Sequence, residues 1–324
     1  MTDHSLDKQN QIALSVVVPV FNEAQNLKPL FTQLIRVLDG LDRCYEIIAV
    51  DDGSADGSFA ILEQLHEENP QVKVVRFRRN FGQTAALAAS FDRAQGEVVV
   101  TIDADLQNDP SDIPRLLDKM TEGYDVVSGW RRDRQDRFLD RKLPSMIANW
   151  LISKVTGVHL HDYGCSLKTY HRDVVKNVHL YGELHRFIPA LASWMGVSVT
   201  ELPVSHSPRR FGRSKYGLSR AVRVLLDLLT VRFMLSYSAR PMQLFGNLGL
   251  LSFVLGVITG LYLSVQKVVY GYRYQIDRPL LLLSVLLMVV GVQLVSMGLL
   301  GELVVRTYHE TQGKPIYVIR EVIE

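Results

Sequence analysis

The segment Val98–Pro110, VVVTIDADLQNDP, joins a run of β-branched apolar residues to a cluster of acids. Asp103 and Asp105 follow the run directly, and Asp109 lies just beyond them. Like charges this close repel one another unless a cation lies among them. Asp109 has a structural explanation, because Asp-Pro is a typical start of a helix. Asp103 and Asp105 have no comparable explanation, and their carboxylates suit Mg²⁺ or Mn²⁺ bound together with substrate phosphates.

Apolar runs and amphipathic stretches alternate before and around this segment. The runs at 13–21, 45–54, 72–77 and 97–105 predict strands, and the stretches 22–41, 54–65 and 82–94 predict helices. Strands separated by amphipathic helices indicate a mainly parallel sheet with helices on both faces. Ligands bind such sheets at the carboxyl ends of the strands, where the polar clusters of this chain lie. The turn after the first predicted strand lacks the glycine-rich pattern of dinucleotide-binding domains, so the sequence does not predict a domain of that kind.

Composition narrows the classes of function. The net charge is only +2, which gives no argument for a nucleic acid partner. Two cysteines, Cys44 and Cys165, are too few for a disulfide framework and fit a reducing compartment. The first residues, MTDHSLDKQNQ, are polar and mixed in charge, so no signal peptide is expected.

Two apolar runs, 244–269 and 280–305, follow the predicted α/β region. Each is long enough to cross a hydrocarbon core of about 30 Å as a helix. Basic residues precede the first run and follow the second, with a smaller number between them. This modest charge bias predicts a multi-pass protein of the inner (cytoplasmic) membrane, with the α/β domain and both termini in the cytoplasm.

The stretch before the first run carries a narrow polar stripe on an otherwise apolar helix. This pattern suits a helix in the membrane interface, and an amphipathic helix packed on the soluble domain is the alternative. Gly256 and Gly260 form a small-residue pair in the first run. Such a pair is compatible with helix association and with a homo-oligomer.

Six motifs occur in an order that resembles the polyprenyl-phosphate glycosyltransferases, inverting GT-A members of glycosyltransferase family 2 similar to dolichyl-phosphate mannose synthase and to the GtrB-type bactoprenol glucosyl transferases. The motifs are VVVPVFNEAQNL, IIAVDDGSADGS, RNFGQTAAL, TIDADLQNDP, DYGCSLKTYHRDV and RRFGRSKYG. The resemblance implies a Rossmann-like GT-A domain at 1–218 and interfacial amphipathic helices at 219–241. It further implies a two-helix transmembrane anchor at 242–306 and a cytoplasmic tail at 307–324.

The resemblance also implies roles for individual residues. The positions matching the nucleotide site are Pro19, Phe21, Glu23, Asp52, Gly82 and Gln83. The positions matching catalytic residues are Asp103, Asp105, Arg131 and Asp162, the last of these near the donor sugar. The metal would be held by Asp103, Asp105 and Gln107. The positions matching the acceptor phosphate site are Arg131, Arg141, Ser145, Arg209 and Lys215. Arginine suits such a site because its planar fork matches phosphate oxygens.

The expected reaction is the inverting transfer of one sugar from a nucleotide sugar to a polyprenyl phosphate at the bilayer. Resemblance alone favours UDP-glucose as the donor and Mg²⁺ or Mn²⁺ as the cofactor. Two alternatives stay open: a processive polysaccharide synthase of the same broad fold, and a non-catalytic, membrane-anchored protein that binds nucleotide sugars. The sequence lacks the Gln-x-x-Arg-Trp signature expected of the first, and its intact acidic and basic motifs argue against the second.

Overall fold

A computed structural model gives the architecture of the chain. It describes residues 12–132, 149, 152–154, 156–178, 180, 184–193, 195–208, 241–270, 278–311 and 316–324. The chain divides into two compact units. The first comprises Met1–Val231 together with Pro315–Glu324, and the second comprises Arg232–Lys314.

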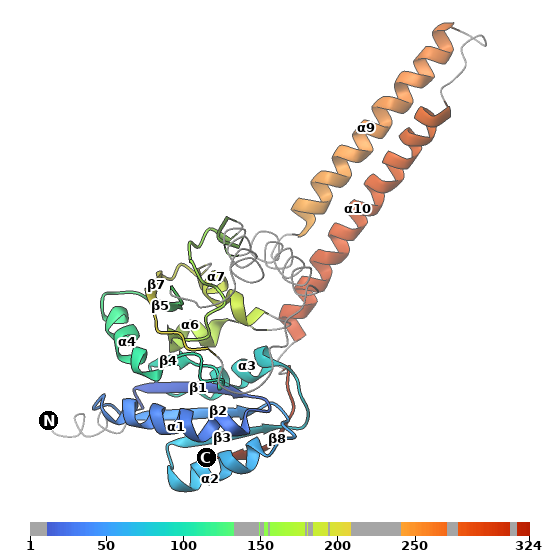
Figure 1. Cartoon of the computed structure of the whole chain (residues 1–324). Coiled ribbons are helices and arrows are strands. Elements are labelled where there is room, and N and C mark those ends of the chain that lie inside the picture. Colours follow the sequence, from blue (N-terminus) through green and yellow to red (C-terminus); the bar gives the residue numbers. More distant parts are fainter. Residues whose placement is uncertain are drawn as a thin grey trace, which may run out of the picture. The chain divides into compact units, whose positions relative to one another are not determined.

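The first unit is built on an eight-stranded sheet with the order β7-β5-β6-β4-β1-β2-β3-β8 (Figure 1). The strands are β1 Leu14–Val20, β2 Tyr45–Asp51, β3 Val72–Phe77, β4 Val98–Thr101, β5 Val126–Trp130, β6 Lys168–His171, β7 Val199–Pro203 and β8 Ile319–Ile323. The helices are α1 Ala24–Asp39, α2 Ser58–Glu68, α3 Gln83–Arg93, η1 Pro110–Asp112, α4 Ile113–Thr121, α6 Arg172–Asn177, η3 Leu184–Phe187 and α7 Ile188–Ser193. Strands β4, β1, β2 and β3 are mutually parallel, whereas β6 and β8 run antiparallel to their neighbours.

Two apolar cores cover the two faces of this sheet. Successive side chains of a strand point to opposite faces, so Val16 and Val18 of β1 pack in one core and Val17 packs in the other. Residues of α1, α2 and α4 complete the first core, and residues of α3, α6 and α7 complete the second. Because both faces are covered, the central strands are nearly continuous apolar runs rather than alternating ones.

The structure confirms the mixed α/β fold with a mainly parallel sheet. Helix η1 begins as the sequence predicts, because the side chain of Asp109 accepts a hydrogen bond from the amide of Ser111 at 2.9 Å. The acids at 103 and 105 follow β4 directly, at the carboxyl end of a central parallel strand. The sequence therefore places the candidate site at the correct edge of the sheet.

The segment 307–324, expected as a cytoplasmic tail, contains the eighth strand of the sheet. Strand β8 pairs antiparallel with β3 and belongs to the first unit. Just before it, the ring of Tyr317 stacks on Phe77 with centroids 5.2 Å apart, and its hydroxyl donates to Asp92 at 2.6 Å. The amide of Arg78 donates to the carbonyl oxygen of Val318 at 3.1 Å. The chain thus returns to the sheet of the first unit after the second unit.

The second unit consists of α9 Pro241–Tyr270 and α10 Arg278–Thr311. Their apolar spans, Phe245–Val269 and Pro279–Gly301, have mean hydropathies of 2.1 and 2.5. Only 17% and 11% of the residues in their most apolar windows are buried, unlike the core helices of a soluble domain. Both spans therefore have the length, composition and exposure expected of transmembrane helices.

Small residues bring α9 and α10 close together. A Cβ on Gly249 would lie 2.6 Å from the carbonyl oxygen of Gly291, so the backbones approach where both residues are glycine. The hydroxyl of Ser284 donates to the carbonyl oxygen of Gly256 at 2.8 Å, and it would lie 2.9 Å from a Cβ on Gly260. The small-residue pair predicted from the sequence therefore packs within the hairpin. A homo-oligomer stays a prediction.

Candidate active site

The candidate site residues lie where β1, β2 and β4 end. Pro19 is near the end of β1, Asp52 follows β2 directly, and Asp103 follows β4. Strand β1 pairs in parallel with both β2 and β4. The carboxyl ends of the three strands therefore lie beside one another, and their polar residues share one edge of the sheet.

The loops after β1 and β2 hold each other in place. The amide of Asn22 donates to Ser54 Oγ at 2.9 Å, and Asn22 Oδ1 accepts from the amide of Ala55 at 2.8 Å. The amide of Glu23 donates to Ser58 Oγ at 3.0 Å. Asn22 has φ of 56°, a left-handed conformation that asparagine adopts more readily than most residues. These contacts fix the backbone next to Phe21 and Glu23, both predicted to lie near the nucleotide.

Asp52 fixes the loop that precedes α3. Its Oδ1 accepts a hydrogen bond from the amide of Phe81 at 2.6 Å, and its Oδ2 accepts one from the amide of Gly82 at 2.9 Å. Gly53 has φ of +70°, and a Cβ there would lie 2.6 Å from the carbonyl carbon of Arg79. The loop can approach this closely because residue 53 is glycine. Burial raises the pKa of Asp52, although the two amide hydrogen bonds oppose the shift.

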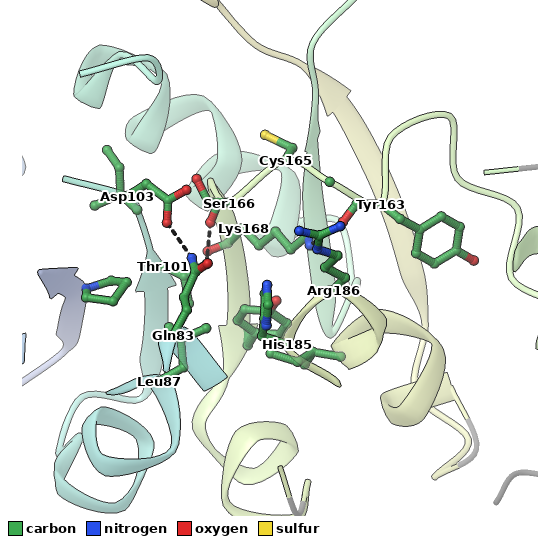
Figure 2. Close-up of a pocket in the computed structure, with 15 residues that line it drawn as sticks. Gln83, Leu87, Thr101, Asp103, Tyr163, Cys165, Ser166, Lys168, His185 and Arg186 are labelled. Atoms are coloured by element: carbon green, nitrogen blue, oxygen red, sulfur yellow. Dashed lines mark hydrogen bonds between the residues drawn. The ribbon is translucent and has the colours of Figure 1, made fainter. Parts of the chain in front are cut away.

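Gln83 joins this loop to the acidic motif. It is the first residue of α3, and its Nε2 donates to Oδ1 of Asp103 at 2.8 Å (Figure 2). Burial and the nearby charge of Asp105 raise the pKa of Asp103 to about 6, against weaker opposing effects from Ser166 and nearby cations. The surroundings of Asp103 thus disfavour its negative charge. A further cation bound here would stabilise it.

The donor set at this position fits a divalent cation. Asp103, Asp105 and Gln107 all offer side-chain oxygens, and the amide of Gln107 donates to Asp105 Oδ1 at 3.1 Å. Within the described ranges, no group of three or more His, Cys, Asp or Glu side chains is placed to hold a metal. Mg²⁺ commonly binds to one or two carboxylates and takes its other ligands from water and substrate phosphates. The pair of carboxylates matches that mode of binding.

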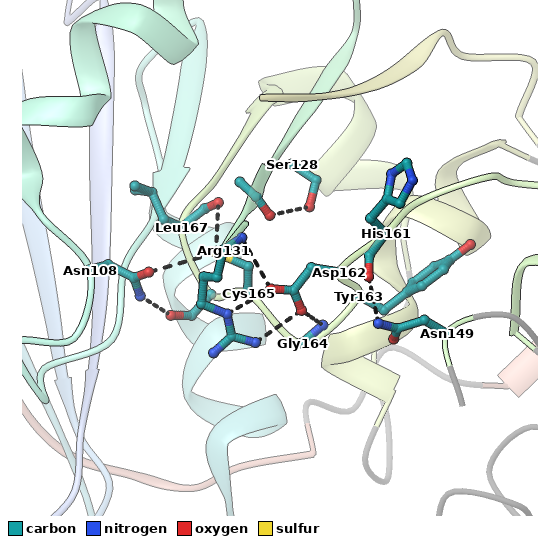
Figure 3. Close-up of polar contacts among 12 residues, drawn as sticks. Asn108, Ser128, Arg131, Asn149, His161, Asp162, Tyr163, Gly164, Cys165 and Leu167 are labelled. Atoms are coloured by element: carbon teal, nitrogen blue, oxygen red, sulfur yellow. Dashed lines mark hydrogen bonds and ion pairs between the residues drawn. The ribbon is translucent and has the colours of Figure 1, made fainter. Parts of the chain in front are cut away.

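Arg131 and Asp162 form a two-point ion pair (Figure 3). Arg131 Nε lies 2.7 Å from Asp162 Oδ2, and Nη2 lies 2.9 Å from Oδ1. The amide of Gly164 also donates to Asp162 Oδ1, at 3.0 Å. The two side chains are only 13% and 5% exposed, so the pair is held rigidly. Burial disfavours the charge on Arg131, but the hydrogen bonds and charge of Asp162 raise its pKa above the ordinary value.

The loop that carries Asp162 is tied to the strand that carries the acids. Thr101 Oγ1 donates to the carbonyl oxygen of Ser166 at 2.6 Å (Figure 2). Asn108 Nδ2 donates to Ser166 Oγ at 2.8 Å. Burial raises the pKa of the neighbouring Cys165 thiol to about 11. The thiol is therefore protonated near neutral pH and is unsuited to act as a nucleophile.

A pocket lies beside Asp103, between the ends of the strands and the segment 184–188 (Figure 2). Pro19 and Gln83 line it, together with three basic side chains that sequence reasoning missed: Lys168, His185 and Arg186. The hydroxyl of Thr84 and Nδ1 of His185 lie 2.8 Å apart, which positions the imidazole beside α3. Lys168 lies in the same sequence motif as Asp162, but a single lysine there does not by itself indicate a site residue.

The structure brings most of the predicted residues together at one edge. Asp52, Gly82, Gln83 and Asp103 are linked by hydrogen bonds, and Arg131 is paired with Asp162. The other predicted acceptor-phosphate residues, Arg141, Ser145, Arg209 and Lys215, lie outside the described residues. Most of the predicted interfacial region, 219–240, also lies outside them.

The fold is that of a GT-A glycosyltransferase, and an acidic motif lies at the end of a central parallel strand. The chain belongs to glycosyltransferase family 2, whose family model matches residues 15–178. A second family model, described as the GtrB C-terminal hairpin, matches residues 240–307 and therefore covers α9 and most of α10.

Curated relatives match nearly the whole chain. A dodecaprenyl-phosphate galacturonate synthase from Rhizobium johnstonii is 42% identical over 98% of this chain and 95% of its own length. An undecaprenyl-phosphate 4-deoxy-4-formamido-L-arabinose transferase from Shewanella sediminis is 38% identical over 97% of this chain and 94% of its own length.

Solved structures share the fold. Glucosyl-3-phosphoglycerate synthase from Mycobacterium tuberculosis, in complex with Mn²⁺, UDP and glucosyl-3-phosphoglycerate, matches with a TM-score of 0.55. The match is 19% identical and covers 72% of this chain and 84% of the synthase chain. The same synthase has been solved with Mn²⁺ and UDP-glucose, and matches with a TM-score of 0.53 at 20% identity. At this level of identity the likeness establishes the GT-A fold.

Proposed function

We propose that the chain transfers one sugar from a nucleoside diphosphate sugar to a polyprenyl phosphate, with inversion at the anomeric carbon. The observation that carries the proposal is the hydrogen bond from Gln83 to Asp103, which joins the predicted nucleotide loop to the predicted metal site. Relatives matching almost the full chain are named for sugar transfer to dodecaprenyl and undecaprenyl phosphate, which supports the same class of acceptor.

The donor would lie along the carboxyl edge of the sheet. Its base and ribose would lie near Pro19, Phe21, Glu23 and the loop held by Asp52, and its diphosphate would lie near Asp103. Asp103, Asp105 and Gln107 would hold Mg²⁺ or Mn²⁺ there, and the ion would neutralise charge on the departing diphosphate.

The acceptor needs little help to become a nucleophile. A phosphate monoester carries a charge of about −1.5 to −2 near neutral pH, so its oxygen can attack without a strong general base. Arg131 holds both carboxylate oxygens of Asp162, and the reaction does not require a strong base at this position. Asp162 therefore serves to orient the donor sugar and to stabilise positive charge at the anomeric carbon. Arg131 holds Asp162 in place and adds positive charge for the phosphates.

The two spans would anchor this unit at the cytoplasmic face of the inner membrane, where a lipid phosphate is available. Met1–Val231, which precedes the second unit in the chain, and Pro315–Glu324, which follows it, belong to one compact unit. That arrangement supports a hairpin with both of its ends on the cytoplasmic side. We further propose that Arg141, Ser145, Arg209 and Lys215 contact the acceptor phosphate, as their match to the family motifs implies.

The donor predicted from the sequence is UDP-glucose. The relatives named above are named for galacturonate and for 4-deoxy-4-formamido-L-arabinose. Glucose is therefore one member of the donor set to be tested.

Release of UDP by the purified full-length protein tests the reaction. Each UDP-sugar is supplied with and without a short-chain polyprenyl phosphate in detergent, with Mn²⁺ present. We expect UDP release that depends on the lipid phosphate and is lost in Asp105→Asn. Binding of the donor without any turnover would instead indicate a non-catalytic binding protein.

A further inference from the structure

The pocket beside Asp103 has a positively charged inner wall that the proposed reaction does not yet explain. Lys168 and Arg186 both line it, and His185 lies between Arg186 and helix α3 (Figure 2). The proposed donor diphosphate and metal account for Asp103 at one side of this pocket. They do not by themselves account for the additional positive charge of Lys168 and Arg186 in the same pocket.

Lys168 is buried in the middle of the fold. It is 3% exposed, and its Nζ donates to the carbonyl oxygen of Tyr163 at 3.1 Å. Burial lowers its pKa to about 8, against the raising effect of nearby acidic groups. Within the part of the chain that the structure describes, no carboxylate forms an ion pair with Lys168. A buried ammonium with a single carbonyl partner is costly unless another group completes its environment.

Arg186 adds a second cation of the same kind. It is half-buried in η3, and it has no hydrogen-bonded or ion-paired partner among the described residues. Guanidinium groups bind carboxylates through two parallel hydrogen bonds, which makes arginine suited to recognise a planar anion. A half-buried arginine aimed into a pocket beside a buried lysine is therefore a preformed site for a carboxylate.

We propose that Lys168 and Arg186 recognise a carboxylate on the donor sugar, so that the preferred donor is a nucleoside-diphosphate-linked uronic acid. This inference rests on the proposed function, because it concerns the sugar of the same donor. It replaces the neutral glucose that the sequence resemblance favours with a sugar carrying a negative charge.

The walls of the pocket favour the donor sugar over the other anions of the reaction. Pro19 and Gln83, both predicted to lie near the nucleotide, line the same pocket as Asp103. Leu87, Tyr170 and Ile188 add an apolar lining that suits the carbon face of a sugar ring and offers nothing to a diphosphate. The negative charge at the inner end is therefore best supplied by a substituent of the sugar.

Matched donor pairs test the proposal in the wild-type protein. UDP-galacturonate is compared with UDP-galactose, and UDP-glucuronate with UDP-glucose, because the members of each pair differ only at C6. We expect kcat/KM for the better uronate to exceed that of its neutral partner by roughly tenfold or more, as for one charge-assisted contact. Neutral donors that match or exceed their uronates would overturn the proposal.

A variant series assigns the effect to this pocket. Arg186→Gln should lower kcat/KM for the uronate by roughly tenfold while leaving the neutral partner almost unchanged, and Arg186→Lys should recover part of the loss. Arg36→Gln, at an exposed position on α1, is the matched control and should change neither. Equal losses for both donors, weaker binding of UDP alone, or a change confined to the KM of polyprenyl phosphate would overturn the assignment.

Donor binding separates this inference from the proposed function. Calorimetry with UDP-galacturonate and UDP-galactose in the presence of Mn²⁺ needs no acceptor and no turnover. Tighter binding of the uronate without transfer to any lipid would support the pocket and contradict the proposed reaction. Transfer to polyprenyl phosphate without uronate selectivity would support the reaction and contradict the pocket.

Discussion

Arg131 Nε lies 2.7 Å from Asp162 Oδ2 in a buried ion pair between residues 31 positions apart in the chain. The contact joins a residue predicted to bind the acceptor phosphate to one predicted to lie near the donor sugar. In the proposed reaction, the two substrates therefore meet at a single rigid element. Moving either side chain disturbs the other, because each satisfies most of its partner's charge.

Replacing Arg131 with methionine should leave Asp162 buried without its cation. We expect a loss of about 3–5 kcal/mol in the free energy of unfolding and loss of transfer, measured by denaturant titration and by UDP release. Asp162→Asn keeps the shape of the side chain and removes its charge, so it should fold and still lose most transfer. Lys119→Met, in the exposed pair with Glu122, is the control and should unfold like the wild type. Wild-type stability of Arg131→Met would contradict the importance of the pair.

The effect of Mn²⁺ on UDP binding should depend on Asp105 and not on Asp109, although both acids lie in the same motif. Asp105→Asn should abolish the enhancement of UDP binding by Mn²⁺, because a carboxylate that would ligate the ion is lost. Asp109→Asn is the matched control, since asparagine caps a helix as well as aspartate does and Asp109 caps η1. Calorimetry of UDP binding with Mn²⁺ and with EDTA gives the readout. Tight UDP binding by the wild type in EDTA, unchanged on adding Mn²⁺, would contradict a metal at this site.

Asp52 should act on nucleotide binding through the loop it holds. Asp52→Asn turns one acceptor into an amide group that faces a backbone N–H, which costs about 1–3 kcal/mol. We expect the loop before α3 to loosen and UDP to bind roughly tenfold more weakly, with the overall fold retained. Asp118→Asn, on the exposed side of α4, makes the same chemical change without a loop to disturb. Equal UDP affinities in the two variants would remove Asp52 from the nucleotide site.

The C-terminal strand should support the same loop from the other side. Tyr317 stacks on Phe77, and Phe77 in turn makes an edge contact with Phe81, whose amide donates to Asp52. Tyr317→Ala should therefore lower the unfolding temperature and weaken UDP binding together.

Tyr317→Phe is the informative partner of that variant. It keeps the stacked ring and removes only the hydrogen bond to Asp92. It should retain nearly wild-type UDP affinity. If Tyr317→Ala binds UDP as the wild type does, β8 is an edge strand without influence on the site.

The central part of the fold could be predicted from the sequence because its signals are local. The runs that form β1, β2 and β4 consist mainly of apolar residues, and acids follow them at the edge where ligands bind parallel sheets. Asp109 could be recognised as a cap from its neighbour alone. The two long apolar helices could be recognised from length and composition.

The remaining features depend on contacts between distant segments. Strand β6 lies between β4 and β5 and runs antiparallel to both, which places Asp162 beside Arg131 and buries Lys168. Lys168 stands in the motif DYGCSLKTYHRDV, but lysine is rarely fully buried, so its residue type did not predict that it would line a pocket. In the sequence, both apolar helices lie between strand β8 and the other strands of its sheet. The short segment that forms β8 therefore gives no sign in the sequence that it pairs with them.

Mass spectrometry of the lipid product tests the central claim most directly. Full-length protein is incubated with polyprenyl phosphate, Mn²⁺ and the UDP-sugar that supports UDP release. The lipids are then extracted and their molecular masses are measured. The account predicts a lipid heavier by the mass of one sugar residue joined through the phosphate, absent in Asp105→Asn. A ladder of products carrying many sugars, or UDP release without any glycosylated lipid, would contradict it.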